Sequence, residues 1–261
     1  MNRCISGVTW WRRCWFIVVL IAFPCFVHSI SLEIAPIRLV LTSQRPISSM
    51  TVGNGDENEI AVQAEIVEWL QENGKDVYLA TPDVVANPLI FRIAPQSKQI
   101  LRIGLRVPEN SRERSYRIFL QQLPRDQALP REGEANSPLQ TLFRVGVPIF
   151  VPPLVSTQDM QWRLSPGEAT RTGGGRYVLS VENKGSEHVQ LTHISIRDAQ
   201  GREVVNKTLA QYVLAGQASA LPLEFPKMNP DTPLQIEVRS DARVPLPQTL
   251  VRVPHAQAKS P

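Results

Sequence analysis

Histidines and cysteines are the side chains best suited to hold a transition metal, and this chain has few of them. Only three histidines follow residue 29, namely His188, His193 and His255. Their spacing matches no metal motif, and no cysteine is available beside them, because Cys4, Cys14 and Cys25 all precede residue 29. We therefore predict no metal site and no cofactor.

Carboxylates and serines could support acid–base or nucleophilic chemistry, but their context does not favour it. Acidic residues cluster at 56–59 and 132–134, both in turn-rich stretches, where solvated loop charges are expected rather than an acid–base pair. No G-x-S-x-G string is present. The glycines at 173–175 precede a strand-like run, whereas a phosphate-binding loop needs a following helix. The sequence predicts no enzyme and no small-molecule substrate.

The first 29 residues have the layout of a secretory signal peptide. Arg3, Arg12 and Arg13 precede an apolar run at 14–27, and compact residues follow it up to Ser29. The run has about 14 residues, fewer than the roughly 20 that a transmembrane helix requires. We expect cleavage near Ser29 and an exported, soluble mature chain.

The charge balance gives no support for nucleic-acid binding. The chain has 28 basic and 24 acidic residues, and the signal segment contains three arginines and no acid. The mature chain therefore has 25 basic against 24 acidic residues, a net charge of about +1. We predict no nucleic-acid partner.

Strand-like runs separated by turn signals fill the first half of the mature chain. Many of them alternate apolar and polar residues with period two, and Asn73-Gly74 is a strong hairpin signal between two of them. Because no long helical pattern intervenes, an antiparallel sandwich is expected. The predicted strands cover residues 31–42, 48–54, 60–70, 76–81, 88–94, 99–107, 115–123 and 139–151.

A second strand-rich region follows Pro152 and Pro153, which end the last of these runs. Its predicted strands cover residues 161–165, 176–183, 188–197, 202–205, 219–225 and 234–240. About 230 mature residues suit two domains of ordinary size. We expect an all-β protein with a signal peptide at 1–29, an N-terminal domain at 30–152 and a C-terminal domain at 153–261.

The run at 139–151 has one continuously apolar face. That face consists of Leu139, Thr141, Phe143, Val145, Val147 and Ile149. It either fills the core of the sandwich or belongs to an exposed edge strand that a partner covers. Pro148 favours an edge position, because proline has no N–H to donate to a ladder.

Several strings, in their order and spacing after a signal peptide, resemble the periplasmic chaperones of the chaperone-usher pathway, and within them the archaic branch. In the first domain the carriers are APIRLVLT, VEWLQENGKDVYLATPDVVANPLIFRIAPQSKQILRI, ERSYRIFLQQLP and FRVGVPIFVPP. In the second they are RYVLSVENKG and YVLAGQASALPL. The resemblance spans nearly all of the mature chain. It implies two immunoglobulin-like β-sandwich domains set at an angle, and a location in the periplasm.

The resemblance also implies a function and its partners. Such a chaperone binds pilin or fimbrial subunits, lends its own edge strand to complete their fold, and passes them to an outer-membrane usher. The donor role then falls on the strand at 139–150. Its groove-filling side chains would be Leu139, Thr141, Phe143, Val145 and Val147. A slip of one residue would exchange the two faces, and Leu142 would then take part.

Basic residues in the inter-domain cleft of this family anchor the terminal carboxylate of the subunit. Arg38 in APIRLVL matches the first-strand arginine of the better-known members, but their last-strand lysine is replaced here by Val147. Arg117 or Arg144 can substitute, because a planar guanidinium can bind both carboxylate oxygens. Each of the three arginines could instead be a surface charge or part of an internal salt bridge.

A secreted immunoglobulin-like module for adhesion or carbohydrate binding is the alternative function. Such a module should show exposed aromatic residues or an acidic calcium-binding loop. Trp69 and Trp162 both lie in strand-like runs, where core positions are expected.

Overall fold

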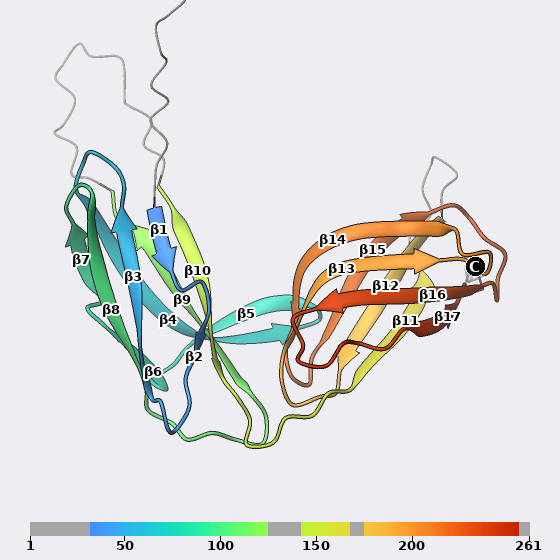
Figure 1. The fold of residues 1–261 in the computed structure, drawn as a ribbon, viewed down its shortest axis with the longest axis horizontal. Helices are drawn as coiled ribbons and strands as arrows, with labels where there is room; N and C mark the ends of the chain where they lie inside the picture. The colour runs from blue at the N-terminus through green and yellow to red at the C-terminus, as the bar shows by residue number, and fades with distance from the viewer. Residues whose placement is uncertain (1–31, 125–141, 168–174, 256–261) are drawn as a thin grey trace, which may run out of the picture.

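A computed structural model describes residues 32–124, 142–167 and 175–255, and the described residues contain strands and no helix. Strands β1 to β10 form one sandwich and β11 to β17 form a second. Figure 1 shows the two sandwiches set at an angle to each other. The predicted all-β fold with two sandwich domains is confirmed.

The first sandwich has one sheet in the order β1-β3-β8-β6 and another in the order β2-β10-β9-β4-β5, with β7 also paired to β4. Alternating apolar residues of the two sheets meet in its core, which includes Leu41, Met50, Leu101 and Ile118. The strands are β1 (Leu32–Ala35), β2 (Leu39–Val40), β3 (Ile47–Asn54), β4 (Ile60–Glu72), β5 (Lys75–Ala80), β6 (Val84–Asn87), β7 (Ile90–Ile93), β8 (Ser97–Leu105), β9 (Arg114–Gln122) and β10 (Arg144–Val151).

The second sandwich packs a sheet of order β11-β12-β15 on one of order β14-β13-β16-β17. Strand β15 shows the alternation clearly, because Ser219, Leu221, Leu223 and Phe225 are buried and their neighbours are exposed. The strands are β11 (Met160–Pro166), β12 (Gly175–Asn183), β13 (Val189–Arg197), β14 (Glu203–Val213), β15 (Ala218–Phe225), β16 (Pro233–Ser240) and β17 (Thr249–Arg252).

The β4–β5 hairpin extends from the first sandwich toward the second (Figure 1). Asn73 and Gly74 form its turn, with φ of 52° and 74°, and Glu72 pairs with Lys75. At this tip, a Cβ on Gly74 would lie 3.6 Å from the backbone nitrogen of Ala220 in β15. The hairpin predicted from Asn73-Gly74 is therefore present, and it spans the two domains.

A third cluster of buried side chains joins the two sandwiches. Trp69, Phe150 and Leu214 are its buried members, and Tyr212 packs against them. Trp69 and Phe150 come from the first sandwich, and Leu214 and Tyr212 come from the second. We refer to these four residues as the inter-domain seam.

Several predicted strands differ from those observed. The run at 31–42 is divided into β1 and β2 by the Ala35-Pro36 segment, because proline cannot donate to a ladder. Strand β14 continues to Val213, well beyond the predicted end at residue 205, and β6 and β17 were not predicted. No helix long and apolar enough to cross a bilayer occurs among the described residues.

Candidate functional site

Strand β10 is paired along its whole length on one side but on only part of the other. It pairs with β9 from Arg144 to Val151, whereas β2 pairs with it only at Ile149 and Phe150. Among the described residues, no strand covers the other side of β10 between Arg144 and Pro148. This segment is an open edge.

The backbone of β10 alternates between its two neighbours. The N–H of Gln122 in β9 donates to the carbonyl of Phe143, whereas the N–H of Leu41 donates to the carbonyl of Phe150 at 2.9 Å, on the opposite side. In an antiparallel ladder this alternation continues along the strand. Arg144 and Gly146 therefore direct their backbone groups to the open edge, where hydrogen bonds to a further strand can form.

The two faces of β10 have different environments. Val147, Ile149 and Val151 are buried in the first core, and Phe143 and Val145 pack against it. Leu139 and Thr141 lie outside the described residues. Val147 is buried in this structure, and its role as a groove-filling residue stays a prediction, as do those of Phe143 and Val145. The opposite face, which begins with Leu142, is the one that β10 presents at its open end: Leu142, Arg144 and Gly146 are exposed, whereas Pro148 and Phe150 are buried.

Arg38 lies between β1 and β2 and binds the second sandwich. Its Nη1 donates to Asp241 Oδ2 at 2.6 Å, and its Nη2 donates to Gln190 Oε1 at 2.6 Å and to Tyr212 Oη at 2.9 Å. Burial works to lower the pKa of Arg38, but the hydrogen bonds to Asp241 and Tyr212 outweigh it and raise the pKa. Arg38 therefore forms an internal ion pair between the domains.

Arg117 in β9 lies on the same side of its sheet as the presented face of β10. Its guanidinium stacks on the Trp69 ring at 3.8 Å from the ring centroid. Nη1 donates to Tyr78 Oη at 2.5 Å and approaches Asp76 Oδ2 at 3.5 Å. The guanidinium is only partly exposed and is held by β4 and β5.

Arg144 at the start of β10 is the most exposed of the three arginines. It stacks on the Phe119 ring at 4.2 Å and lies 3.6 Å from a carboxylate oxygen of Glu65. An exposed pair at this distance contributes little to stability.

The three arginines belong to one chain of stacked cations and rings. Arg144 lies over Phe119, Phe119 meets Tyr78 edge-on at 5.1 Å, and Arg117 lies between Tyr78 and Trp69. Trp69 then contacts Tyr212 at 5.2 Å, and Arg38 lies 5.7 Å from the Tyr212 ring. These contacts run from the outer face of this sheet, beside the open edge of β10, to the inter-domain seam, where Trp69 is buried.

Comparison with known proteins assigns the first sandwich to a family. Residues 31–155 match the family model for pili and flagellar-assembly chaperones, PapD N-terminal domain. The N-terminal domain of this chain belongs to that family. The resemblance inferred from the sequence is thereby confirmed. A separate search for curated proteins of similar sequence found no match.

Solved structures of chaperones share the fold over most of the chain. One is a chain of the CsuC–CsuE chaperone–tip adhesion subunit complex from archaic Csu pili of Acinetobacter baumannii, with a TM-score of 0.61 at 16% identity, covering 87% of this chain and 100% of that one. A second is from the Salmonella enterica SafA pilin–SafB chaperone complex, with a TM-score of 0.53 at 16% identity, covering 86% of this chain and 97% of that one. The E. coli chaperone DraB has a TM-score of 0.50 at 18% identity, covering 86% of this chain and 99% of that one. At these identities the likeness shows the fold alone.

His188 of the second sandwich contacts the first sandwich. The His188 ring stacks on Phe150 at 3.6 Å between centroids, and its Nδ1 lies 2.7 Å from Glu113 Oε1. Asp241 Oδ2 is 3.8 Å from Nε2 of the same ring. His188 is therefore a structural residue that links the domains, with carboxylates on both sides.

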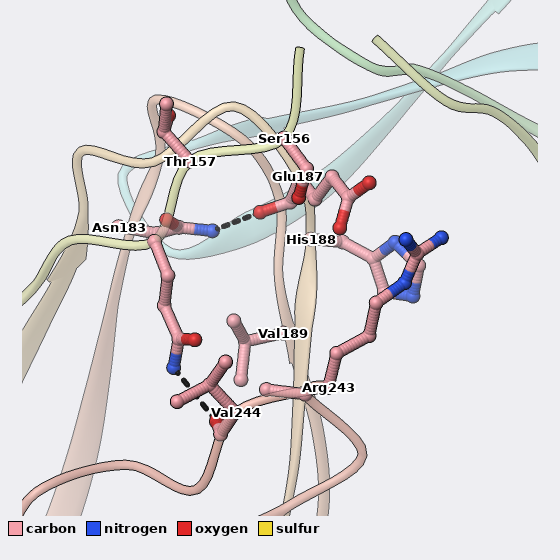
Figure 2. Close-up of a pocket in the computed structure, with 10 residues that line it drawn as sticks. Ser156, Thr157, Asn183, Glu187, His188, Val189, Arg243 and Val244 are labelled. Carbon is pink, nitrogen blue, oxygen red and sulfur yellow. Dashed lines mark hydrogen bonds between the residues drawn. The ribbon is translucent and has the colours of Figure 1, made fainter.

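A cavity of about 310 Å³ lies beside His188, under the segment that connects the sandwiches. Asn183 Nδ2 donates to the carbonyl of Glu187 at 2.8 Å, and Gln158 Nε2 donates to the carbonyl of Val244 at 3.1 Å (Figure 2). The Asn183 bond closes the loop between β12 and β13, and the Gln158 bond joins the connecting segment to the loop that follows β16. Among the described residues, no three histidine, cysteine or acidic side chains gather to bind a metal.

Sequence reasoning did not identify the acids and rings around Arg117. Asp76, Tyr78 and Trp69 lie in predicted strands, but the sequence predicts no contact between them and Arg117. The hairpin signal could have found them, because a two-residue Asn73-Gly74 turn sets Trp69 opposite Tyr78 and Gln71 opposite Asp76. The partners of Arg38 had no such signal.

Proposed function

We propose that this protein is a periplasmic chaperone that binds pilus or fimbrial subunits by strand addition and delivers them to an outer-membrane usher. The observation that carries the proposal is the open edge of β10, which lies in a domain of the PapD chaperone family. A subunit strand that pairs with Arg144 and Gly146 gains main-chain hydrogen bonds. Binding of this kind needs no covalent chemistry.

The side chains that enter the subunit are those of the face that begins with Leu142. This face has the phase opposite to Phe143, Val145 and Val147, which pack on the core of the chaperone itself. Because successive side chains of a strand point to opposite faces, the face that packs on the chaperone core is not the face that enters the subunit. Leu142 supplies the apolar contact nearest the described start of the strand.

Arg117 is the residue that we propose as anchor for the terminal carboxylate of the subunit. Arg38 already donates to Asp241, Gln190 and Tyr212, and Arg144 is exposed at the far end of the surface. Arg117 lies between them and is partly withdrawn from water, which strengthens a charge-assisted hydrogen bond. The domain boundary at 152 and 153 also remains part of the proposal, since β10 ends at Val151 and β11 starts at Met160.

The alternative of a carbohydrate-binding module has little support. Trp69 is buried in the inter-domain seam, and Trp162 is partly buried against the second core. Trp69 is therefore not available to a sugar, and Trp162 is available only in part.

Co-expression tests the chaperone function. We expect the mature chain, produced in a periplasm with the major subunit of a neighbouring pilus-like operon, to purify as a soluble one-to-one complex. Leu142→Glu should abolish the complex, because a charge cannot enter an apolar groove. Val145→Glu is a poor test, since it would place the charge against the core of the chaperone.

Ile100→Glu is the matched control, because Ile100 is equally apolar and is 56% exposed on the other sheet. It should leave the complex intact, and both variants should unfold at the wild-type temperature. Equal yields of complex with the two variants, or no co-purified subunit at all, would contradict strand addition at this edge.

A further inference from the structure

Asp76 is the carboxylate closest to the proposed anchor, and its hydrogen bonds hold it there. Gln71 Nε2 donates to Asp76 Oδ1 at 3.1 Å, and Tyr78 Oη donates to Asp76 Oδ2 at 3.1 Å. Arg117 Nη1 is 3.5 Å from the same Oδ2. Asp76 is therefore fixed beside Arg117, but at the limit of a direct hydrogen bond.

The Arg117 guanidinium has one donor, Nε, that no described residue uses. Its Nε is buried and has no hydrogen-bond partner among the described residues, and the same holds for Nε1 of Trp69 beneath it. Buried donors are nearly always paired in folded proteins. The geometry thus leaves an acceptor missing next to Arg117, although Asp76 is close by.

The charges of this group cancel. Burial raises the pKa of Tyr78, Arg117 works against this, and Asp76 adds to it, so the pKa is raised overall. Tyr78 therefore keeps its proton and carries no charge at neutral pH. Arg117 and Asp76 together have a formal charge of zero, and a bound carboxylate would make it −1.

We infer that Asp76 is a resident competitor which weakens the binding of a terminal polypeptide carboxylate at Arg117. The inference rests on the proposed function and concerns the regulation of its anchor. A site of zero charge holds an incoming carboxylate less strongly than a site of charge +1, because Asp76 repels it. Binding stays reversible, as exchange of a subunit to its next partner requires.

Asp76→Asn tests the inference, because asparagine keeps the size and an acceptor oxygen but removes the charge. The probes are acetylated pentaalanine with a free terminal carboxylate and the same peptide with a terminal amide. Binding is followed at low salt through the indole N–H resonance of Trp69 by NMR. The mature chain contains only Trp69 and Trp162, so Trp162→Phe assigns the signal.

The wild type should bind the free-carboxylate peptide weakly and the amide not measurably. Asp76→Asn should bind the carboxylate about three- to tenfold more tightly, the effect of one nearby charge in a partly solvated site. The gain should shrink as salt is raised. Glu65→Gln is the control, since it removes a carboxylate from the same face beside Arg144, and it should leave the affinity unchanged.

Arg117→Ala separates failure of the inference from failure of the anchor. If Arg117→Ala abolishes carboxylate binding while Asp76→Asn binds no more tightly than wild type, Asp76 is not a competitor and the anchor stands. The anchor and the inference are both wrong under two joint results. The Arg117→Ala variant binds the free-carboxylate peptide as tightly as the wild type does, and the wild type binds the amide peptide equally tightly. Strand addition is tested separately by Leu142→Glu.

Discussion

Gly146 leaves room for the Arg117 side chain and the Phe119 ring of the neighbouring strand β9. A Cβ at Gly146 would lie 2.9 Å from Arg117 Cδ and 2.9 Å from Phe119 Cε1, closer than real Cβ contacts. The absence of a side chain therefore allows Arg117 to lie against Trp69. Gly146 is a positioning residue for the proposed anchor.

We predict that Gly146→Ala displaces Arg117 and weakens binding of the free-carboxylate peptide. Crowding of this kind costs about 1–3 kcal/mol when neighbours have to shift. The Trp69 indole resonance should move even without peptide, because the cation above its ring is displaced. Gly104→Ala is the control, since its Cβ would meet Val85 Cγ2 at an ordinary 3.6 Å. Wild-type affinity and an unchanged Trp69 signal in Gly146→Ala would contradict the prediction.

At this scale the sequence identified cations but not their partners. Arg38, Arg117 and Arg144 were selected, and all three lie in one stacked surface. The acid that binds Arg38 is Asp241, which is 203 residues away in the chain. No local pattern carries information about such a pair, so the distinction between a free and an engaged arginine required the structure.

The β4–β5 hairpin is the element that brings Asp76 and Tyr78 to Arg117. Its Asn73-Gly74 turn uses positive φ at both positions, a conformation that glycine adopts without strain. The turn also touches the backbone of β15. Its register therefore determines both the anchor and a contact between the domains.

We predict that Gly74→Ala loosens this hairpin locally. The left-handed conformation costs a residue with a Cβ about 1 kcal/mol, and hydrogen exchange of the β5 amides should accelerate accordingly. Gly201→Ala is the matched control, because Gly201 has φ of 76° and no atom within 4 Å of its Cβ position. It should cost similar global stability without affecting β5. Equal exchange of the β5 amides in both variants would contradict the prediction.

Most strands could be predicted because alternation is a local property, but the phase of β10 could not. Its odd positions are mostly apolar, yet three even positions, Leu142, Pro148 and Phe150, are apolar as well. Which face meets the core depends on the opposite sheet, which the strand itself does not encode. Strand β14 was predicted too short for a related reason, since its exposed middle carries Asn206, Lys207 and Thr208 rather than an apolar alternation.

Across the whole molecule, the two sandwiches are coupled by a seam that is small, buried and polar at its rim. His188 stacks on Phe150 of the seam, and the Arg38–Asp241 and Glu113–His188 pairs lie around it. Each sandwich has its own core, so folding of either domain does not require the seam. What the seam determines is the angle between the open edge of β10 and the second domain.

Gln71 makes the most direct hydrogen bonds across this seam, and we predict that Gln71→Ala uncouples the domains. Its Oε1 accepts from the Leu214 N–H at 3.0 Å and its Nε2 donates to the Tyr212 carbonyl at 3.0 Å, with the side chain almost fully buried. Loss of the amide leaves the Leu214 N–H without this acceptor and removes one of two side-chain donors to the Tyr212 carbonyl, at about 1–3 kcal/mol. That cost falls on the coupling between the domains, because both cores remain intact.

Calorimetry should therefore show the thermal transition of the wild type broaden or divide in Gln71→Ala, and small-angle scattering should show a wider range of inter-domain angles. Gln99→Ala, which removes an exposed amide on β8, should change neither. Because the two Gln71 bonds across the seam join neutral groups, the loss of coupling should not depend on salt, whereas an Arg38→Gln variant should lose more coupling at low salt than at high salt. A single sharp transition and unchanged scattering in Gln71→Ala would contradict the prediction and mean that the other contacts between the domains hold the angle.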